Sequence, residues 1–263
     1  MTIALSISHA LWIAARVESM GRLREQLGVV DLAHHFDGAP HFYREETERT
    51  PLHYWSESQW RWALATGADV CLFAQDDIEV APDFWARFEA LCSAPWTILA
   101  MHSAHPAGMT IARAGGRWYT TADGLIGTMY AMRRDELERF LAWRRDELLP
   151  GGIEAITEDT MIGCYALARG IRIWSPLPAL HDHLTHVASE FANDQNPHRR
   201  PLVTWKDADV LGPEVKGEPP HLGRFWRMAA WTLKRWCPAW SPELHEKAEA
   251  DLCPERFRRF FPY

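Results

Sequence analysis

Two adjacent acids, Asp76 and Asp77, directly follow an apolar run at residues 70–74 and are preceded by Gln75. A short apolar run of this kind predicts a buried strand. Carboxylates at the exit of such a strand lie at the carboxyl edge of a sheet, where open α/β folds bind ligands. Because adjacent acids repel each other and resist burial, a divalent metal carrying a phosphorylated ligand would explain them. A solvated turn, with Asp77 capping a following helix, is the alternative.

Three further segments could converge on this pair. Residues 124–128 carry two glycines around the start of a strand, where backbone can approach a ligand closely. Thr157, Glu158 and Asp159 follow a Gly-Gly loop at the start of a helix. Residues 181–186 contain three histidines after a strand and two prolines. These four segments are the candidate site.

The acids at residues 158 and 159 have two interpretations. Thr157 is a good helix N-cap, and acids in a first turn complement the helix dipole, so capping alone explains them. A carboxylate there could instead face the cleft as a general base that deprotonates an acceptor hydroxyl.

The histidine segment indicates a metal ligand more directly. In an extended chain His181 and His183 share one face, and His186 lies three residues further on. Together with distant carboxylates, one of these imidazoles suits Mn²⁺ or Mg²⁺ with phosphate completing the coordination, whereas a His-only zinc site is the alternative. The pairs His34-His35 and His102/His105 could line the same cleft.

Composition narrows the functional classes. The formal net charge of −7 argues against general coating of nucleic acid, although the segment from residue 221 onward is mildly basic. The 14 Trp residues are expected mainly in the core, with sugar or base platforms as a second use. P-loop, dinucleotide-binding, zincin and nucleophile-elbow motifs are absent. Five cysteines without a CxxC pair, no leader and no membrane-length run predict a soluble cytoplasmic protein.

The alternation of strand and helix patterns predicts an α/β fold. Strands are expected at residues 3–8, 29–32, 70–74, 97–101 and 171–174, and helices at 17–27, 50–67, 83–91, 135–148 and 159–168. Short strand-like pieces at 109–112, 118–120 and 128–132 predict a small antiparallel insertion. Residues 193–220 are expected to form a linker or wrapping loop, followed by helices near 225–236 and 242–250.

Taken together, the four segments resemble those of a GT-A type glycosyltransferase over roughly the first 190 residues. Gln75-Asp76-Asp77 resembles the DxD-like motif of such enzymes, with Gln in place of the first acid, and residues 127–134 resemble the strand beside the sugar. Glu158-Asp159 resembles the acidic pair that supplies the base in inverting members, and residues 178–189 resemble a late segment that provides a metal-ligating His.

The resemblance implies a GT-A-like Rossmann-type sandwich with a mainly parallel central sheet and a helical C-terminal extension. Its catalytic domain would span residues 1–200, and residues 201–263 would pack on it. The implied ligands are a nucleotide-diphosphate sugar, UDP-linked as first choice, and Mn²⁺ or Mg²⁺. The roles implied are Asp77 and His183 for the metal, Ser8, Arg16, Asp76 and Gly127 for the nucleotide sugar, and Asp159 with Glu158 for catalysis.

The acceptor remains open at this stage. It could be a saccharide or another small hydroxyl compound, or a hydroxymethylated base in DNA as for some phage enzymes. A metal-dependent phosphohydrolase or nuclease would use the same acids and histidines, and a non-catalytic carbohydrate-binding module is the most distant alternative.

Overall fold

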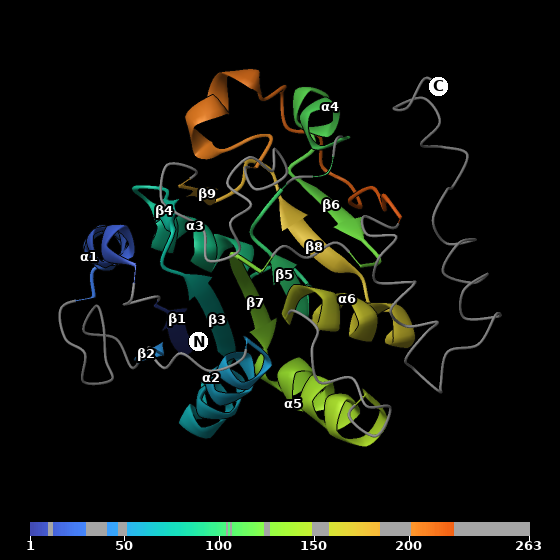
Figure 1. Ribbon diagram of the computed structural model, residues 1–263. Coiled ribbons are helices and arrows are strands. Elements are labelled where there is room, and N and C mark those ends of the chain that lie inside the picture. The colour runs from blue at the N-terminus through green and yellow to red at the C-terminus, as the bar shows by residue number, and fades with distance from the viewer. Residues whose placement is uncertain are drawn as a thin grey trace.

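The computed structural model describes residues 1–9, 13–29, 41–46, 52–103, 105, 107–123, 127–148, 158–184 and 201–223 (Figure 1). In chain order the elements are β1 (Ile3–Ser8), α1 (Ala14–Gln26), β2 (Phe42–Glu46), α2 (Leu52–Thr66), β3 (Val70–Gln75), β4 (Ile78–Val80), α3 (Phe84–Leu91), β5 (Ile98–Ala100), α4 (Ala107–Arg113), β6 (Trp118–Thr121), β7 (Met129–Arg133), α5 (Arg134–Trp143), the π-helix η1 (Arg144–Leu148), α6 (Glu158–Arg169), β8 (Ile173–Pro176), β9 (His181–His183) and the 3₁₀ helix η4 (Trp205–Val210).

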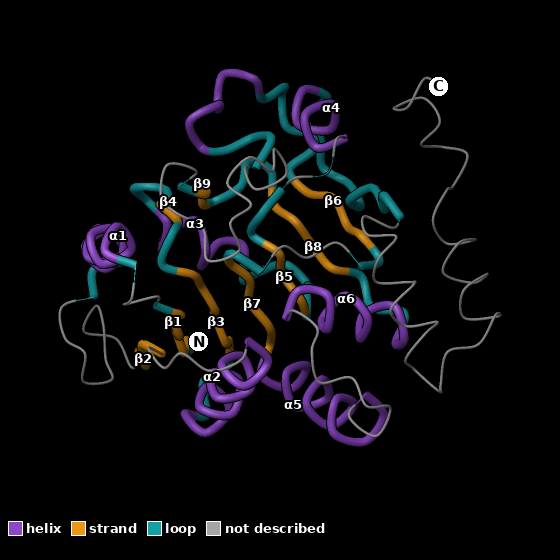
Figure 2. Tube along the Cα trace, in the orientation of Figure 1, coloured by secondary structure: helices purple, strands orange, loops and turns teal. Residues whose placement is uncertain are grey.

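Within the described residues, seven strands form one sheet in the order β2-β1-β3-β7-β5-β8-β6 (Figure 2). Strands β2, β1, β3, β5 and β8 run in one direction, and β7 and β6 run against them. A separate antiparallel pair joins β4 to β9, with Ile78 opposite His183. The expected α/β fold with a mainly parallel central sheet is therefore confirmed, and the small antiparallel sheet is made by β4 and β9.

Strand alternation gives the sheet one hydrophobic core on each face. On β3, Cys71 and Phe73 point to the core shared with α2, α5 and α6. Val70, Leu72 and Ala74 of the same strand point to the core shared with α1 and α3. Both faces of the central strands are therefore largely dry, although the buried Ser6 lies within β1.

Most of the expected elements are present, with shifts of a few residues at their ends. The strand at residues 3–8 and the helices that begin near 17, 50, 83, 135 and 159 all form. Gly28 and Gly67 follow the ends of α1 and α2 with φ of 64° and 75°, a region that favours glycine. The expected helix 135–148 is α helical only to Trp143 and continues as η1.

Two expectations need correction. Residues 109–112 are not a strand, because they lie in α4, where Ala107 and Ile111 are buried with the one-turn spacing of a helix. Such a short apolar run does not separate helix from strand by pattern alone. The pieces near 118 and 128 are strands, β6 and β7, but they belong to the main sheet. Among the described residues the second strand is β2, and the strand expected at residues 29–32 stays untested because residues 30–32 lie outside the described ranges.

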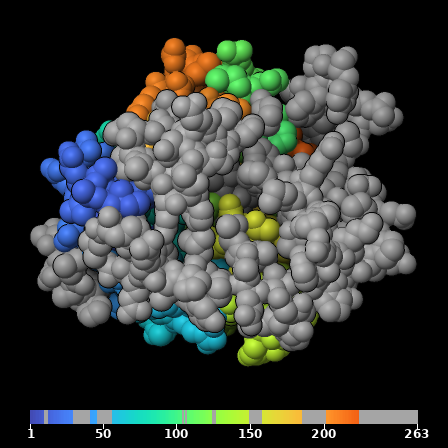
Figure 3. Space-filling view, in the orientation of Figure 1, coloured from blue at the N-terminus to red at the C-terminus, as the bar shows by residue number. Residues whose placement is uncertain are grey.

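Residues 201–223, which include the described part of the wrapping loop expected at 193–220, lie along α4 and β6. Gly212 N donates to Ala112 O at 3.0 Å, and Thr120 N donates to Pro220 O at 2.8 Å. Figure 3 shows η4 and α4 side by side on the surface. The helices expected near 225–236 and 242–250 lie outside the described residues, so the domain boundary at residue 200 stays a prediction.

No helix in the described ranges is long and apolar enough to cross a membrane. Cys71 and Cys92 are free thiols, and burial raises the pKa of Cys71 to about 12 and that of Cys92 to about 11.

Candidate functional site

Polar side chains gather at one edge of the sheet. Ser8 at the end of β1 pairs in register with Gln75 at the end of β3, and the reversed strand β7 begins opposite Ala74. The carboxyl ends of parallel strands thus meet the loop before β7, as expected for an open α/β sheet. Asp76 and Asp77 form the turn that connects β3 to β4 at this edge.

Arg16 of α1 bridges the two acids. One terminal nitrogen of its guanidinium contacts Asp76 Oδ1, and the other lies 2.7 Å from Asp77 Oδ2. Ser19, one turn further along α1, donates a hydrogen bond to the backbone oxygen of Asp76. Arg16 is 5% exposed, Asp76 1% and Asp77 0%, so the guanidinium compensates carboxylates that water does not reach.

Two imidazoles flank this ion pair. His183 of β9 places Nε2 3.1 Å from Asp77 Oδ2, and both side chains are fully buried. His9, directly after β1, places Nε2 3.8 Å from Asp76 Oδ2. The buried cluster therefore combines residues from the ends of β1 and β3, from α1 and from the β4–β9 ladder.

Hydrogen bonds of the backbone hold β9 in place. Leu184 N donates to Asp77 O at 2.8 Å, and Ala81 N donates to Leu180 O at 2.9 Å. Lys206 adds a side-chain link, since its ammonium contacts Glu79 and lies 3.3 Å from Asp182 Oδ2. The position of His183 thus depends on residues from separate parts of the chain.

The acids of α6 meet the same edge through Gln75. Glu158 accepts hydrogen bonds from the Gln75 side chain and from Ser56 Oγ at 2.7 Å, with Tyr130 Oη 3.5 Å away. A side chain at Gly127 would place its Cβ 2.9 Å from Glu158 Oε1. Glycine at 127 therefore lets the start of β7 lie directly against the start of α6.

Burial raises the pKa of Glu158 from 4.5 to about 7, and the neighbouring charge of Asp159 adds to the effect. Hydrogen bonds from Ser56, Tyr130 and Gln75 act in the opposite direction. Asp159 Oδ1 accepts a hydrogen bond from Thr160 N at 2.7 Å. Glu158 is thus suited to hold a proton near neutral pH.

His181 has a different environment from His183. Its Nε2 lies 2.8 Å from Thr128 Oγ1 and 3.4 Å from His102 Nδ1. Burial, with the nearby His102 and His183, lowers the pKa of His181 well below its ordinary value. His181 is therefore a neutral ring inside a buried polar layer. Burial also lowers the pKa of His105 to about 4.

The structure brings the described members of all four predicted segments together. Asp77 contacts His183, and Gln75 joins Glu158 and, through its N–H, Thr128 O at 2.9 Å. Ser8 Oγ donates to Ala74 O at 3.3 Å beside them. Thr157, His186, the pair His34-His35 and residues 124–126 lie outside the described residues. The role of each residue stays a prediction.

Sequence reasoning missed several members of the site. His9 follows a strand end as Asp76 does, so the same rule could have found it. Ser56, which contacts Glu158, lies 102 residues from it and carries no local pattern. Tyr130 lies within the predicted segment 127–134, but its contact with Glu158, 28 residues away, was not predicted.

The donor chemistry of Asp77 and His183 fits a divalent ion in part. Adjacent ligands of a six-coordinate Mg²⁺ or Mn²⁺ stand about 3 Å apart, close to the 3.1 Å between Asp77 Oδ2 and His183 Nε2. Mg²⁺ sites commonly use one or two protein ligands with water and substrate phosphate. No group of three or more His, Cys, Asp or Glu side chains among the described residues is arranged to hold a metal ion.

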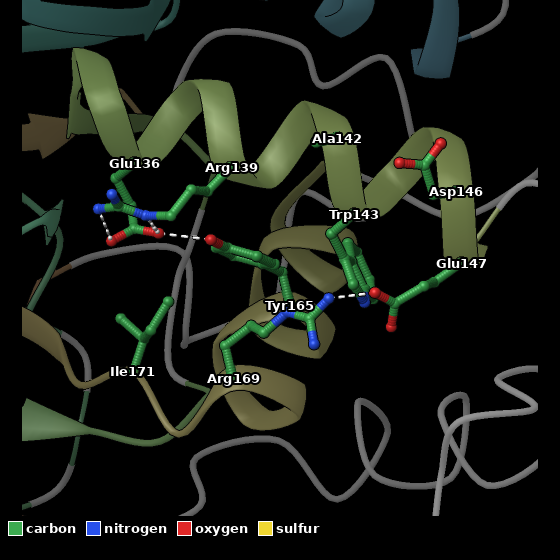
Figure 4. A pocket seen from close by; sticks show the side chains of 9 residues that line it. All are labelled: Glu136, Arg139, Ala142, Trp143, Asp146, Glu147, Tyr165, Arg169 and Ile171. Atoms are coloured by element: carbon green, nitrogen blue, oxygen red, sulfur yellow. Dashed lines mark hydrogen bonds and ion pairs between the residues drawn. The ribbon is translucent and has the colours of Figure 1, made fainter.

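A cavity of about 510 Å³ lies elsewhere, between α5, η1 and α6 (Figure 4). Its charged residues pair with one another, as Arg139 does with Glu136 and Arg169 with Glu147. Arg169 ends α6, about 16 Å of helix from Glu158. The cavity is therefore separate from the acidic edge.

No protein-family model and no curated protein matches this chain. Among solved structures, A197 from STIV covers 83% of this chain and 100% of its own at 14% identity, with a TM-score of 0.45. A glycosyltransferase involved in the glycosylation of the major capsid of PBCV-1 covers 62% and 74% at 15% identity, with a TM-score of 0.34. A mannose-1-phosphate geranyltransferase from Thermus thermophilus covers 66% and 73% at 12% identity, with a TM-score of 0.40. Two of these three structural neighbours are thus transferases by name, and the similarity is distant.

Proposed function

We propose that the chain is a glycosyltransferase that moves a sugar from a nucleotide-diphosphate sugar, UDP-linked as first choice, to a hydroxyl group of a saccharide or small acceptor. One observation carries the proposal. The buried pair Asp76-Asp77, compensated by Arg16, lies at the same sheet edge as the acids of α6, with Gln75 in contact with Glu158. Charge-compensating groups for a diphosphate and a proton acceptor for a hydroxyl are thus combined in one place.

On the donor side, Asp76, Ser8, Gly127 and Arg16 would contact the nucleotide sugar. The guanidinium of Arg16 offers N–H donors that suit phosphate oxygens. Asp77 and His183 would hold Mn²⁺ or Mg²⁺, which when bound supplies positive charge that neutralises the departing diphosphate. The backbone at Gly127 would let the sugar approach β7 closely.

On the acceptor side, Asp159 would remove the proton of the attacking hydroxyl, if the reaction inverts the anomeric centre. Glu158, with its pKa raised to about 7, would keep a proton below that pH. A protonated Glu158 does not repel an ionised Asp159, so the pair can present one carboxylate to the acceptor.

Thermal unfolding with a panel of nucleoside diphosphates and nucleotide sugars, with and without Mn²⁺, tests the donor class. A ligand at a hundred times its dissociation constant stabilises the folded state by about 2.7 kcal/mol. We expect one nucleoside diphosphate to raise Tm only when Mn²⁺ is present, and Asp77→Asn to remove the rise. Asp83→Asn, at an exposed acid before α3, is the matched control and should keep it.

If no nucleotide raises Tm in the presence of Mn²⁺, the transferase proposal is wrong. A phosphohydrolase or nuclease is the second candidate, because buried His–Asp pairs also serve phosphate hydrolysis. It predicts release of inorganic phosphate or nucleotides without an acceptor, and mass spectrometry of the products distinguishes the two.

The proposed domain boundary lies at residue 200. Residues 1–200 would form the catalytic domain and residues 201–263 an extension packed on it. Free thiols at Cys71 and Cys92 accord with a reducing, cytoplasmic setting.

A further inference from the structure

Four ligand-type side chains surround the guanidinium of Arg16 as two pairs. His9 lies beside Asp76, at 3.8 Å, and His183 lies beside Asp77, at 3.1 Å. We call these four residues the His–Asp quartet. Each member is at most 5% exposed. Both carboxylates contact Arg16, one on each terminal nitrogen, so the guanidinium occupies the space between the two pairs.

His9 is the unexplained member of the quartet. Neither of its ring nitrogens has a hydrogen-bond partner within the described part of the chain, although the residue is 5% exposed. Buried polar atoms without partners are uncommon in native proteins and need a reason. Because Nε2 lies 3.8 Å from Asp76 Oδ2, which is too far for a direct hydrogen bond, a bound cation or ligand at this position would supply the missing partner.

The charges of the quartet suit the same kind of ligand. Both carboxylates contact one guanidinium, so two anionic side chains face a single cationic position at a site from which water is largely excluded. A divalent ion in place of the guanidinium would compensate both acids and accept lone pairs from neutral imidazoles. With Arg16 in between, no three described side chains of these types are arranged to hold a metal ion.

We propose that Arg16 is a built-in cation that competes with a divalent metal ion for the His–Asp quartet, and that His9 is a ligand of that ion. The inference rests on the proposed function and adds two roles to it. When the metal ion binds Asp76 and Asp77, Arg16 is displaced from these carboxylates. Its N–H groups then become available to the diphosphate of the donor. Metal and nucleotide sugar would therefore bind cooperatively, and neither would bind well alone.

Binding of Mn²⁺ alone tests the competition without any nucleotide. The electron paramagnetic resonance signal of free Mn²⁺ is lost on binding, so titration gives the dissociation constant for each variant. Arg16→Gln removes a positive charge that contacts both acids. This variant should therefore bind Mn²⁺ at least about tenfold more tightly than the unmodified chain does. Arg22→Gln, at an exposed arginine of α1 paired with Glu18, is the matched control and should bind Mn²⁺ as the unmodified chain does.

The role of His9 is tested in the same background. Adding His9→Gln to Arg16→Gln should weaken Mn²⁺ binding about tenfold, the size expected for an altered metal shell. Unchanged or weaker Mn²⁺ binding by folded Arg16→Gln overturns the competition, and an unchanged constant after His9→Gln overturns the ligand role.

Arg16→Gln leaves two buried acids without their cation and could unfold. Arg16→Lys keeps the charge but cannot span both carboxylates, so it should also bind Mn²⁺ more tightly than the unmodified chain, and equal affinity overturns the proposal. Mn²⁺ should also raise the Tm of either variant more than that of the unmodified chain. A chain that binds Mn²⁺ in this manner but no nucleoside diphosphate would disprove the proposed function alone.

Discussion

Single residues at the acidic edge are tied to one another by charge. Asp76 and Asp77 are buried because Arg16 reaches both of them, and breaking a buried ion pair costs about 3–5 kcal/mol since the remaining charge has no partner. The edge therefore cannot be altered one charge at a time without a cost in stability. This coupling is why each substitution at the edge needs a matched control for folding.

Glu158 links stability to pH. Its pKa is raised from 4.5 to about 7, so between these values the folded chain binds a proton that the unfolded chain has lost. Stability must then fall as pH rises from 4.5 to 7, by up to about 1.4 kcal/mol for each pH unit. Glu158→Gln removes the titration, and its stability relative to the unmodified chain should increase over the same window and level off above pH 7. Urea unfolding at pH 5, 6, 7 and 8 measures this.

Glu89→Gln, at an exposed acid of α3, controls for the loss of one negative charge. Its stability relative to the unmodified chain should be nearly the same at all four pH values. If Glu158→Gln shows the same flat profile, Glu158 titrates near its ordinary value and does not hold a proton at neutral pH.

The residues of the site were predictable to the extent that strand ends mark them. Asp76 and Asp77 follow a strand, and the rule that ligands bind at carboxyl ends identified them. His183 was predicted from its segment of three histidines and from the family resemblance. Arg16 was expected only from the family resemblance, because a helical arginine has no distinguishing local pattern. Its partners lie about 60 residues away in the chain, and only the fold brings them together.

At the scale of elements, apolar runs bounded by glycine were the most predictable feature. β1 and β3 are buried on both faces, so β3 is a continuous apolar run up to Gln75 and β1 is mainly apolar, interrupted by Ser6. β2 contains Arg44, Glu45 and Glu46 and lies at the sheet edge, so its polar sequence gave no strand signal. The prediction at α4 was wrong for a different reason. Its residues are apolar enough to suggest a strand, and seven residues are too few to establish a helical period.

The contact between α4 and the segment at 211–215 depends on glycine. Gly115 has φ of 86°, and a Cβ on it would lie 1.8 Å from Pro213 O. Gly115→Ala must therefore both strain the backbone, by about 1–3 kcal/mol, and push the segment away. We expect a clearly lower Tm and faster trypsin cleavage after the exposed Lys216.

Gly67→Ala is the matched control for this substitution. Gly67 also has a positive φ, of 75°, but a Cβ added to it would have nothing within 4 Å, so only the backbone strain applies. Its Tm should fall less, and cleavage at Lys216 should be unchanged. Equal losses of Tm in both variants, with equal cleavage, would show that the segment is not held by this contact.

At the scale of the whole molecule, the two faces of the sheet pack against hydrophobic cores, and its polar edge carries the charged residues of the candidate site. Helices cover both faces of the central strands, so the strand ends cannot shift independently of two hydrophobic cores. The acidic edge is consequently held by the most buried part of the protein. That arrangement suits chemistry that needs charges fixed in place before the substrate binds.

The charge of the whole molecule bears on the acceptor. A net charge of −7 opposes the phosphate backbone of DNA, so we expect a saccharide or small hydroxyl compound rather than a modified base. Fluorescence anisotropy with a labelled duplex containing hydroxymethylated bases should give a dissociation constant weaker than about 10⁻⁴ M at physiological salt. An affinity that falls about 10³-fold or more between 50 and 200 mM salt would instead reveal roughly six or more phosphate contacts and establish DNA as the acceptor surface.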